Sequence, residues 1–301
     1  MNYKALEEFC INNNIEYKKD ELMKNHTSFK IGGPVDIFIS PRDEDSLCDL
    51  LKEMQKEDIP YFILGKGSNL LVSDKGIRGA VISLAMLDDI AVKGNEITAG
   101  AGASLCAVCV KAQQSGLAGL EFAYGIPGAV GGAIYMNAGA YGGEMSQVVK
   151  SACYVTPKGE KGVINADDMA LGYRTSVFKG NGLIITSVTF ELEAGAGDEI
   201  QSKMDDFMGR RKAKQPLEYP SAGSTFKRPE GHFAGALIEK NNLKSTRVGG
   251  AMVSEKHAGF IINYDNATAT DVKGLMTLVT ETVLREDGVT LEPEVIFVGE
   301  E

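Results

Sequence analysis

Apolar residues follow helical spacing in some stretches of the chain and form short strand-like runs in others. Spacings of three and four residues predict helices over 3–13, 43–57, 104–115, 198–214, 233–241 and 270–287. Short alternating or continuous apolar runs predict strands over 35–40, 61–64, 80–84, 88–94, 96–100, 151–156, 182–192, 251–254, 259–263 and 294–298. The pattern predicts an α+β protein in three parts. A small α/β unit comes first, then a mixed sheet with helices, then a part that follows the proline break at 216–220.

The segment Leu120–Gly143 departs from both patterns. It holds seven glycines among small and apolar residues, with one acid near its start and no base. Glycine loses much backbone entropy on folding, so this density needs a reason. A flexible surface loop is one reading, but such loops are polar and this segment is apolar. We therefore expect close approach to a ligand, with the backbones of Gly131 and Gly132 against it and bare N–H groups facing an anion such as a pyrophosphate.

A second glycine loop, GKGSN at residues 65–69, joins two apolar runs. Strand, tight turn and strand is the predicted order. The loop is not a P-loop, because no Gly-Lys-Ser/Thr opens a helix. It also lacks the third glycine of the Rossmann fingerprint. If it cradles phosphate, it does so by another design.

Composition and charge narrow the function. The chain has 301 residues, with 44% hydrophobic and 24% charged residues, which suits a globular protein of two or three domains. A net charge of −10 argues against a nucleic-acid surface. The opening MNYKALEEFC is unlike a signal peptide, and no run reaches the length of a membrane helix, so no membrane insertion is expected.

Five scattered cysteines suit a reducing cytoplasm. Cys106 and Cys109 form a CxxC on the helix predicted over 104–115, where Leu105, Val108 and Ala112 share one face. No second Cys or His pair completes a metal ligand set, so no metal is expected, and both cysteines are predicted to be buried structural residues.

The helix predicted over 198–214 ends in a basic cluster, Arg210-Arg211-Lys212-Ala213-Lys214. Complementing the helix dipole is one explanation. Four bases in five residues exceed that need, so anion binding by at least one of them is an equal alternative.

Six segments together resemble the UDP-N-acetylenolpyruvoylglucosamine reductase (MurB) family. They are NHTSFKIGG (25–33), ILGKGSNLLVSD (63–74), YGIPGAVGGAIYMNAGAYG (124–142), GYRTSVFK (172–179), PSAGSTFKRP (220–229) and EPEVIFVG (292–299). Only about forty residues separate Arg174 from Lys214, as in the shorter form of that family, which lacks an extra tyrosine loop.

The resemblance implies a fold similar to the FAD-binding fold of the vanillyl-alcohol-oxidase/p-cresol-methylhydroxylase class, with a C-terminal α+β substrate domain. The implied domains are a first FAD-binding subdomain at 1–79, to which a final strand at 296–301 returns, a second at 80–213, and a substrate domain at 214–295. The resemblance does not indicate an oligomeric state.

The implied reaction uses NADPH and FAD to reduce UDP-N-acetylglucosamine enolpyruvate to UDP-N-acetylmuramate in peptidoglycan precursor synthesis. FAD would be bound without a covalent link. Its implied contacts are Gly65, Lys66, Gly67, Ser68, Asn69, Gly125, Ile126, Pro127, Gly128, Gly131, Gly132, Ala133, Asn137, Gly139 and Ala140.

Three residues take catalytic roles by resemblance. Arg174 would hold the substrate carboxylate, for which a planar, always charged guanidinium is suited. Glu294, if burial kept its proton, would donate to the developing enolate. Ser224 would give a proton to carbon 2, with help from a neighbour or water because a hydroxyl is a weak acid.

Lys214 and Arg228 are the implied contacts of the substrate diphosphate, although Arg228 stands where some family members have asparagine. Lys212 and Arg211 are less certain. His257 would either seat the substrate or nicotinamide, or play a structural role. Two other functions remain open at this point: an FAD oxidase acting on an alcohol or hydroxy acid, and a non-catalytic nucleotide-binding module.

Overall fold

The computed structural model describes residues 3–300. The chain forms two compact units, each assembled from three stretches. The first unit takes the chain up to Lys19, then Ile37–Lys66 and Gly79–Arg211. The second takes Asp20–Asp36, Gly67–Arg78 and the chain from Lys212 onward. The three-domain division expected from the sequence stays a prediction.

A four-stranded sheet, most of whose residues belong to the first unit, has the order β1-β2-β5-β3. Strands β3 and β5 run parallel. Its elements, with the neighbouring helices, are α1 (Tyr3–Asn12), β1 (Glu16–Leu22), the 3₁₀ turn η1 (Met23–Asn25), β2 (Pro34–Ser40), α2 (Glu44–Lys56), β3 (Tyr61–Leu64) and β5 (Ile77–Ser83). The apolar face of α2 explains its place, since Leu47, Leu50, Leu51 and Met54 are fully buried.

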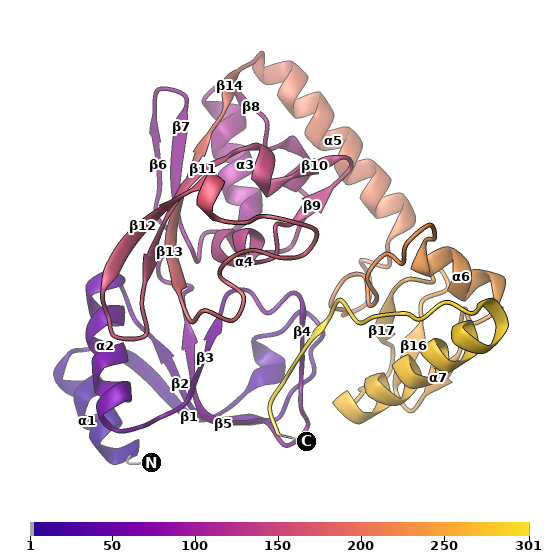
Figure 1. Cartoon of the computed structure of the whole chain (residues 1–301), viewed down its shortest axis with the longest axis horizontal. Helices are drawn as coiled ribbons and strands as arrows, with labels where there is room; N and C mark the ends of the chain where they lie inside the picture. The colour runs from indigo at the N-terminus through magenta and orange to yellow at the C-terminus, as the bar shows by residue number, and fades with distance from the viewer. Residues whose placement is uncertain (1–2, 301) are drawn as a thin grey trace. The chain divides into compact units, whose positions relative to one another are not determined.

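A second sheet in the first unit has the order β12-β11-β13-β7-β6 (Figure 1). Its strands are β6 (Ile90–Lys93), β7 (Glu96–Gly100), β11 (Val149–Val155), β12 (Lys161–Asn165) and β13 (Ile184–Glu191). All four pairings are antiparallel, so the expected mixed sheet was wrong. Helices α3 (Leu105–Gln114) and α4 (Val130–Tyr135) pack against β7, and α4 also against β13.

The smaller elements of the first unit connect these parts. They are β8 (Leu117–Ala118) paired with β14 (Glu193–Ala194), β9 (Gly139–Ala140) paired with β10 (Gly143–Glu144), the 3₁₀ turns η2 (Glu121–Ala123), η3 (Met145–Gln147) and η4 (Ala166–Asp168), and α5 (Gly197–Lys214), which ends beyond the unit.

The second unit contains a three-stranded antiparallel sheet, β15-β16-β17, with α7 packed on β15 and β16 and α6 packed on α7 (Figure 1). The elements are β4 (Leu70–Val72), α6 (Ala234–Lys240), β15 (Arg247–Val248), β16 (Ala251–Val253), β17 (Ile261–Asn263), α7 (Ala269–Asp287) and β18 (Ile296–Val298). Strand β18 pairs in parallel with β4, which follows the GKGSN loop.

Most predicted elements are confirmed within a few residues. The sequence analysis missed β1, β12, the short helix α4 inside the glycine-rich segment, and the two-residue strands β8, β9, β10, β14 and β15. Cys109 is buried as expected, but Cys106 is exposed, because the buried face of α3 comprises Leu105, Val108, Cys109 and Ala112. No helix in residues 3–300 is both long and apolar enough to cross a bilayer.

The N-terminus of α7 is held by acidic side chains. Thr268 and Asp271 form a capping box, and Asp74 accepts hydrogen bonds from the N–H groups of Ala269 (2.7 Å) and Thr270 (3.0 Å). The Thr270 hydroxyl also donates to Asp74, at 2.9 Å. Asp74 therefore satisfies backbone donors that the helix leaves without an internal partner.

Asp74→Ala should lower the free energy of unfolding by about 1–3 kcal/mol, because these donors lose a charged acceptor at the positive end of the helix. Urea unfolding of the purified protein measures it. The free energy of unfolding of Asp74→Asn, which keeps one acceptor oxygen, should lie between those of the wild-type protein and Asp74→Ala. An unchanged midpoint in the alanine variant would contradict the assignment.

Candidate functional site

The glycine-rich segment folds onto the chain around Ala101–Leu105. The N–H groups of Val130 and Gly131 donate to the carbonyls of Ala103 and Ala101, both at 2.9 Å, and Leu105 N–H donates to Gly128 O at 3.1 Å. Two N–H groups in the first turn of α4 therefore donate hydrogen bonds within the protein. The N–H groups of Val130 and Gly131 are therefore not free to face an anion.

The glycines of this segment have different reasons to be glycine. A methyl group added at Gly131 would lie 2.9 Å from the Ala101 Cβ, so packing against the protein accounts for that residue. At Gly132, which is exposed, a methyl group would meet nothing within 4 Å. Gly132 is therefore the glycine of α4 whose open side is available to a ligand.

Gly65, the first residue of the GKGSN loop, lies next to the start of α4. A methyl group at Gly65 would lie 3.5 Å from Ala129 Cβ, at the residue that precedes α4. Gly65 and Lys66 belong to the first unit, and Gly67, Ser68 and Asn69 to the second. Gly67 has φ +59°, and a Cβ there would meet His26 O at 2.1 Å. Asn69 donates from its amide to Glu294 O, at 3.1 Å.

A cavity of about 330 Å³ in the first unit opens beside this junction. Small and apolar residues form most of its wall, and Lys66, Asp88 and Ser104 are its polar side chains. The complete lining is Gly65, Lys66, Ala85, Asp88, Ile90, Gly102, Ala103, Ser104 and Ala107. Its size is at the lower end of ordinary ligand pockets, and its flat, small-residue wall suits part of a planar cofactor.

Arg174 sits in a tight turn that is fixed to the C-terminal end of α4. Gly172 and Thr175 exchange backbone hydrogen bonds of 3.1 and 3.2 Å, which closes the turn. Asn137 donates to Gly172 O at 3.1 Å, and Ser176 donates to Tyr135 O at 2.8 Å. The Arg174 backbone has φ +55°, an uncommon conformation for a residue with a side chain. Such strain is maintained where the surroundings enforce it, and it often marks functional positions.

The second unit brings Ser224 and Glu294 together. Ser224 is exposed, whereas its neighbour Thr225 is 1% exposed. Thr225 is held on two sides: its carbonyl accepts from Glu294 N–H at 2.9 Å, and its hydroxyl accepts from Ile261 N–H at 2.9 Å. Glu294 is half-buried, two residues before β18. Thr225, which the sequence did not single out, thus anchors the loop that presents the Ser224 hydroxyl.

The implied phosphate contacts of the second unit are exposed. Lys214 ends α5, and the Arg228 guanidinium lies 4.0 Å from the centre of the Phe233 ring. His257 accepts from Gly259 N–H at 3.1 Å through Nδ1 and packs edge-on against Phe260. Burial lowers the pKa of its imidazole, and the charge of Lys214 acts in the same direction. A neutral ring therefore carries its proton on Nε2.

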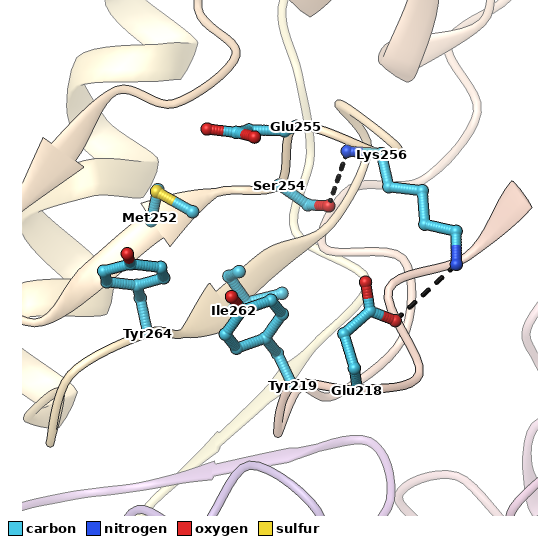
Figure 2. A pocket seen from close by; sticks show the side chains of 8 residues that line it. All are labelled: Glu218, Tyr219, Met252, Ser254, Glu255, Lys256, Ile262 and Tyr264. Atoms are coloured by element: carbon cyan, nitrogen blue, oxygen red, sulfur yellow. Dashed lines mark hydrogen bonds and ion pairs between the residues drawn. The ribbon is translucent and has the colours of Figure 1, made fainter.

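A second cavity, of about 380 Å³, lies on β16 and β17 in the second unit (Figure 2). Tyr219 and Tyr264 lie side by side in its wall, with ring centroids 5.6 Å apart. Two of its charged residues are paired, since Lys256 lies 3.6 Å from the Glu218 carboxylate, and Glu255 accepts a hydrogen bond from the Ser245 hydroxyl at 2.9 Å. None of the residues predicted to be functional lines this cavity.

The geometry of the first unit fits FAD. The open side of Gly132, the contact of Gly65 with the start of α4, and the mostly small residues that line the cavity suit close approach of a cofactor. Residues 35–162 match the family model described as an FAD binding domain. An FAD-dependent oxidoreductase is the class of protein that this fold and site define.

The remaining comparisons identify the family. Residues 215–298 match the model of the C-terminal domain of UDP-N-acetylenolpyruvoylglucosamine reductase. The chain is 52% identical over 286 residues to the enzyme of that name from Clostridium kluyveri, covering 95% of the chain and 94% of the relative. It is 50% identical to the one from Clostridium novyi, covering 95% and 93%.

Solved structures agree. The reductase from Thermus caldophilus has a TM-score of 0.81 and 35% identity, covering 94% of this chain and 98% of that one. Glucooligosaccharide oxidase from Acremonium strictum, which carries FAD, shares the fold at a TM-score of 0.51 and 12% identity, covering 96% and 60%. The chain belongs to the UDP-N-acetylenolpyruvoylglucosamine reductase family.

Proposed function

We propose that this enzyme reduces UDP-N-acetylglucosamine enolpyruvate to UDP-N-acetylmuramate at the expense of NADPH, a step of peptidoglycan precursor synthesis. When bound, FAD carries the hydride between the two substrates. The observation that carries the proposal is the anchoring of the Ser224 loop to the Glu294 segment through the buried Thr225. Two groups able to give protons are thereby fixed in one part of the second unit.

Each catalytic residue has a separate task. Hydride addition to the vinyl carbon pushes negative charge into the substrate carboxylate, and Arg174, held in its strained turn, provides a fixed cation for it. Glu294 donates a hydrogen bond to the same developing charge when its carboxyl group is protonated. Ser224 gives the proton that completes carbon 2, and its exposed position leaves the hydroxyl accessible to substrate.

Cofactor binding and substrate binding are also assigned to separate residues. Gly65–Asn69 and the 125–140 segment hold FAD. Lys214 and Arg228 bind the diphosphate of the sugar nucleotide, for which exposed basic side chains are suited. We also propose that the chain divides into three domains at residues 80 and 214, with two FAD-binding subdomains before the substrate domain. The five cysteines are free, which fits a reducing compartment, and we place the enzyme in the cytoplasm.

Steady-state assays test the proposal directly. NADPH consumption should depend on UDP-N-acetylglucosamine enolpyruvate, and the purified protein should show flavin absorbance. Flavin colour with oxidation of an alcohol or hydroxy acid, and no response to the sugar nucleotide, would favour the alternative FAD oxidase. A colourless protein that binds nucleotide without turnover would favour a non-catalytic module.

The flavin should be bound without a covalent link. We expect acid precipitation to release all of it into the supernatant, because the lining of the cavity contains no histidine or cysteine to which flavin could be attached. Absorbance of supernatant and pellet measures the partition. Yellow colour that stays in the pellet after washing would contradict this prediction.

A further inference from the structure

Arg211 stands apart from the other bases of its cluster. Arg210, Lys212 and Lys214 are exposed, whereas Arg211 is half-buried in the first unit. Arg210 is paired with Asp206, at 2.8 Å between Nη2 and Oδ2. Within residues 3–300, no carboxylate pairs with Arg211 and no hydrogen bond engages its guanidinium. Compensating the dipole of α5 explains a charge at this helix end, but it does not explain burial.

The surroundings of Arg211 are the glycine-rich segment. A methyl group added at Gly125 would lie 2.9 Å from Arg211 Cδ and 3.7 Å from its Nη1. Gly125 is therefore glycine to admit the arginine side chain. Tyr141, at the far end of the same segment, is stacked on Phe207 one turn earlier in α5, with centroids 4.9 Å apart and planes 3° from parallel.

A cation in this position costs free energy unless an anion joins it. Burial lowers the pKa of Arg211, which shows that the surroundings disfavour its charge. A guanidinium remains protonated nonetheless, and its planar fork matches phosphate oxygens. The position beside Gly125 is thus an anion site that the protein alone leaves uncompensated.

We propose that Arg211 is a binding residue for a nucleotide diphosphate at the glycine-rich segment. The inference rests on the proposed function. Three molecules of that reaction carry a diphosphate, namely FAD, the UDP-sugar and NADPH, and we assign Arg211 to one of the first two, for which few cations are assigned. The carboxylate of the substrate already has Arg174. Both sources present the same chemistry, two linked phosphate groups, to one guanidinium fork.

Two variants and one control test the proposal. Arg211→Ala should weaken the affinity for one diphosphate by about tenfold or more, equal to about 1.4 kcal/mol. Gly125→Ala should act in the same direction, because its methyl group displaces a flexible side chain without removing charge. Arg210→Ala removes a neighbouring, exposed arginine and should leave both affinities unchanged.

The measurements separate the two sources. Fluorescence titration of flavin-free protein with FAD gives one dissociation constant, and calorimetric titration of FAD-saturated enzyme with UDP gives the other. A change confined to FAD assigns Arg211 to the cofactor, and a change confined to UDP assigns it to the sugar nucleotide. Affinities in Arg211→Ala that match those of Arg210→Ala would overturn the proposal. Equal weakening of both ligands would overturn it too, since that result means a deformed loop.

Binding of FAD and UDP to the wild-type protein distinguishes failure of the Arg211 assignment from failure of the proposed function. Suppose that wild-type enzyme binds FAD and UDP, and that Arg211→Ala binds both as tightly as Arg210→Ala does. The proposed function then stands and the assignment of Arg211 fails. If wild-type enzyme binds neither ligand, the proposed function itself fails.

Discussion

Gly132→Leu should yield a folded protein that no longer retains flavin. The position is exposed on α4, and a Cβ there meets no protein atom within 4 Å, so we expect the leucine side chain to be accommodated without a clash. Leucine also favours a helix by roughly 0.5–1 kcal/mol over glycine. If FAD lies over the open side of α4, the isobutyl group occupies cofactor space and the purified protein should be colourless. Flavin absorbance per protein, with circular dichroism for the fold, measures the outcome.

Gly209→Leu is the matched control. Gly209 is an exposed glycine of α5 with open space around it, in the same unit as Gly132. The control variant should keep its full flavin content. Gly131→Ala tests the other half of the interpretation: its methyl group would press on Ala101, so stability should fall. A Gly132→Leu variant with normal flavin content would place the cofactor elsewhere.

The sequence predicted elements wherever an apolar period was present. Helix α7 has a clear period together with Thr268 and Asp271 at its start, and it was predicted from 270, one residue after its observed start at Ala269. Strand β1, EYKKDEL, has no buried residue, so nothing in its pattern distinguishes it from a loop. Its place comes from pairing with β2, which is a tertiary effect.

The short helix α4 shows a different limit. Two glycines in VGGAIY argue against a helix by propensity. Packing against Ala101 and hydrogen bonds to Ala101 and Ala103 override that preference. At Gly131 the close approach is to Ala101 of the protein itself, so the density of glycine could not tell which glycine faces protein and which faces open space.

The assignment of the candidate site residues stays a prediction, and the contacts that support these residues could not be read from the sequence. Arg174, Ser224 and Glu294 came from ordered sequence segments that resemble a family. Their supports, such as Thr225 beneath Ser224 and Tyr135 beneath the Arg174 turn, come from hydrogen bonds between distant parts of the chain. The burial of Arg211 could not be predicted either, because four bases within five residues look alike in the sequence until one of them packs against Gly125.

Ser224→Ala should separate the two halves of the reaction. NADPH should still bleach the flavin absorbance at a near-normal rate, because no step of that half needs the hydroxyl. Recovery of the absorbance on adding UDP-N-acetylglucosamine enolpyruvate should slow by a factor on the order of hundreds or more, the effect expected for loss of a general acid. Substrate affinity should change little, since one neutral hydrogen bond is worth on the order of 1 kcal/mol.

The structure makes this substitution a chemical test and not a folding test. Ser224 is exposed, and the contacts that fix its loop are made by Thr225, which the variant keeps. Ser221→Ala, which removes another hydroxyl of the same loop, is the control and should leave both phases unchanged. Ser224→Cys should recover part of the second phase, because a thiol also delivers a proton. Stopped-flow absorbance reads the two phases separately: equal slowing of both would mean that Ser224 shapes the pocket, and an unaffected second phase would remove it from the mechanism.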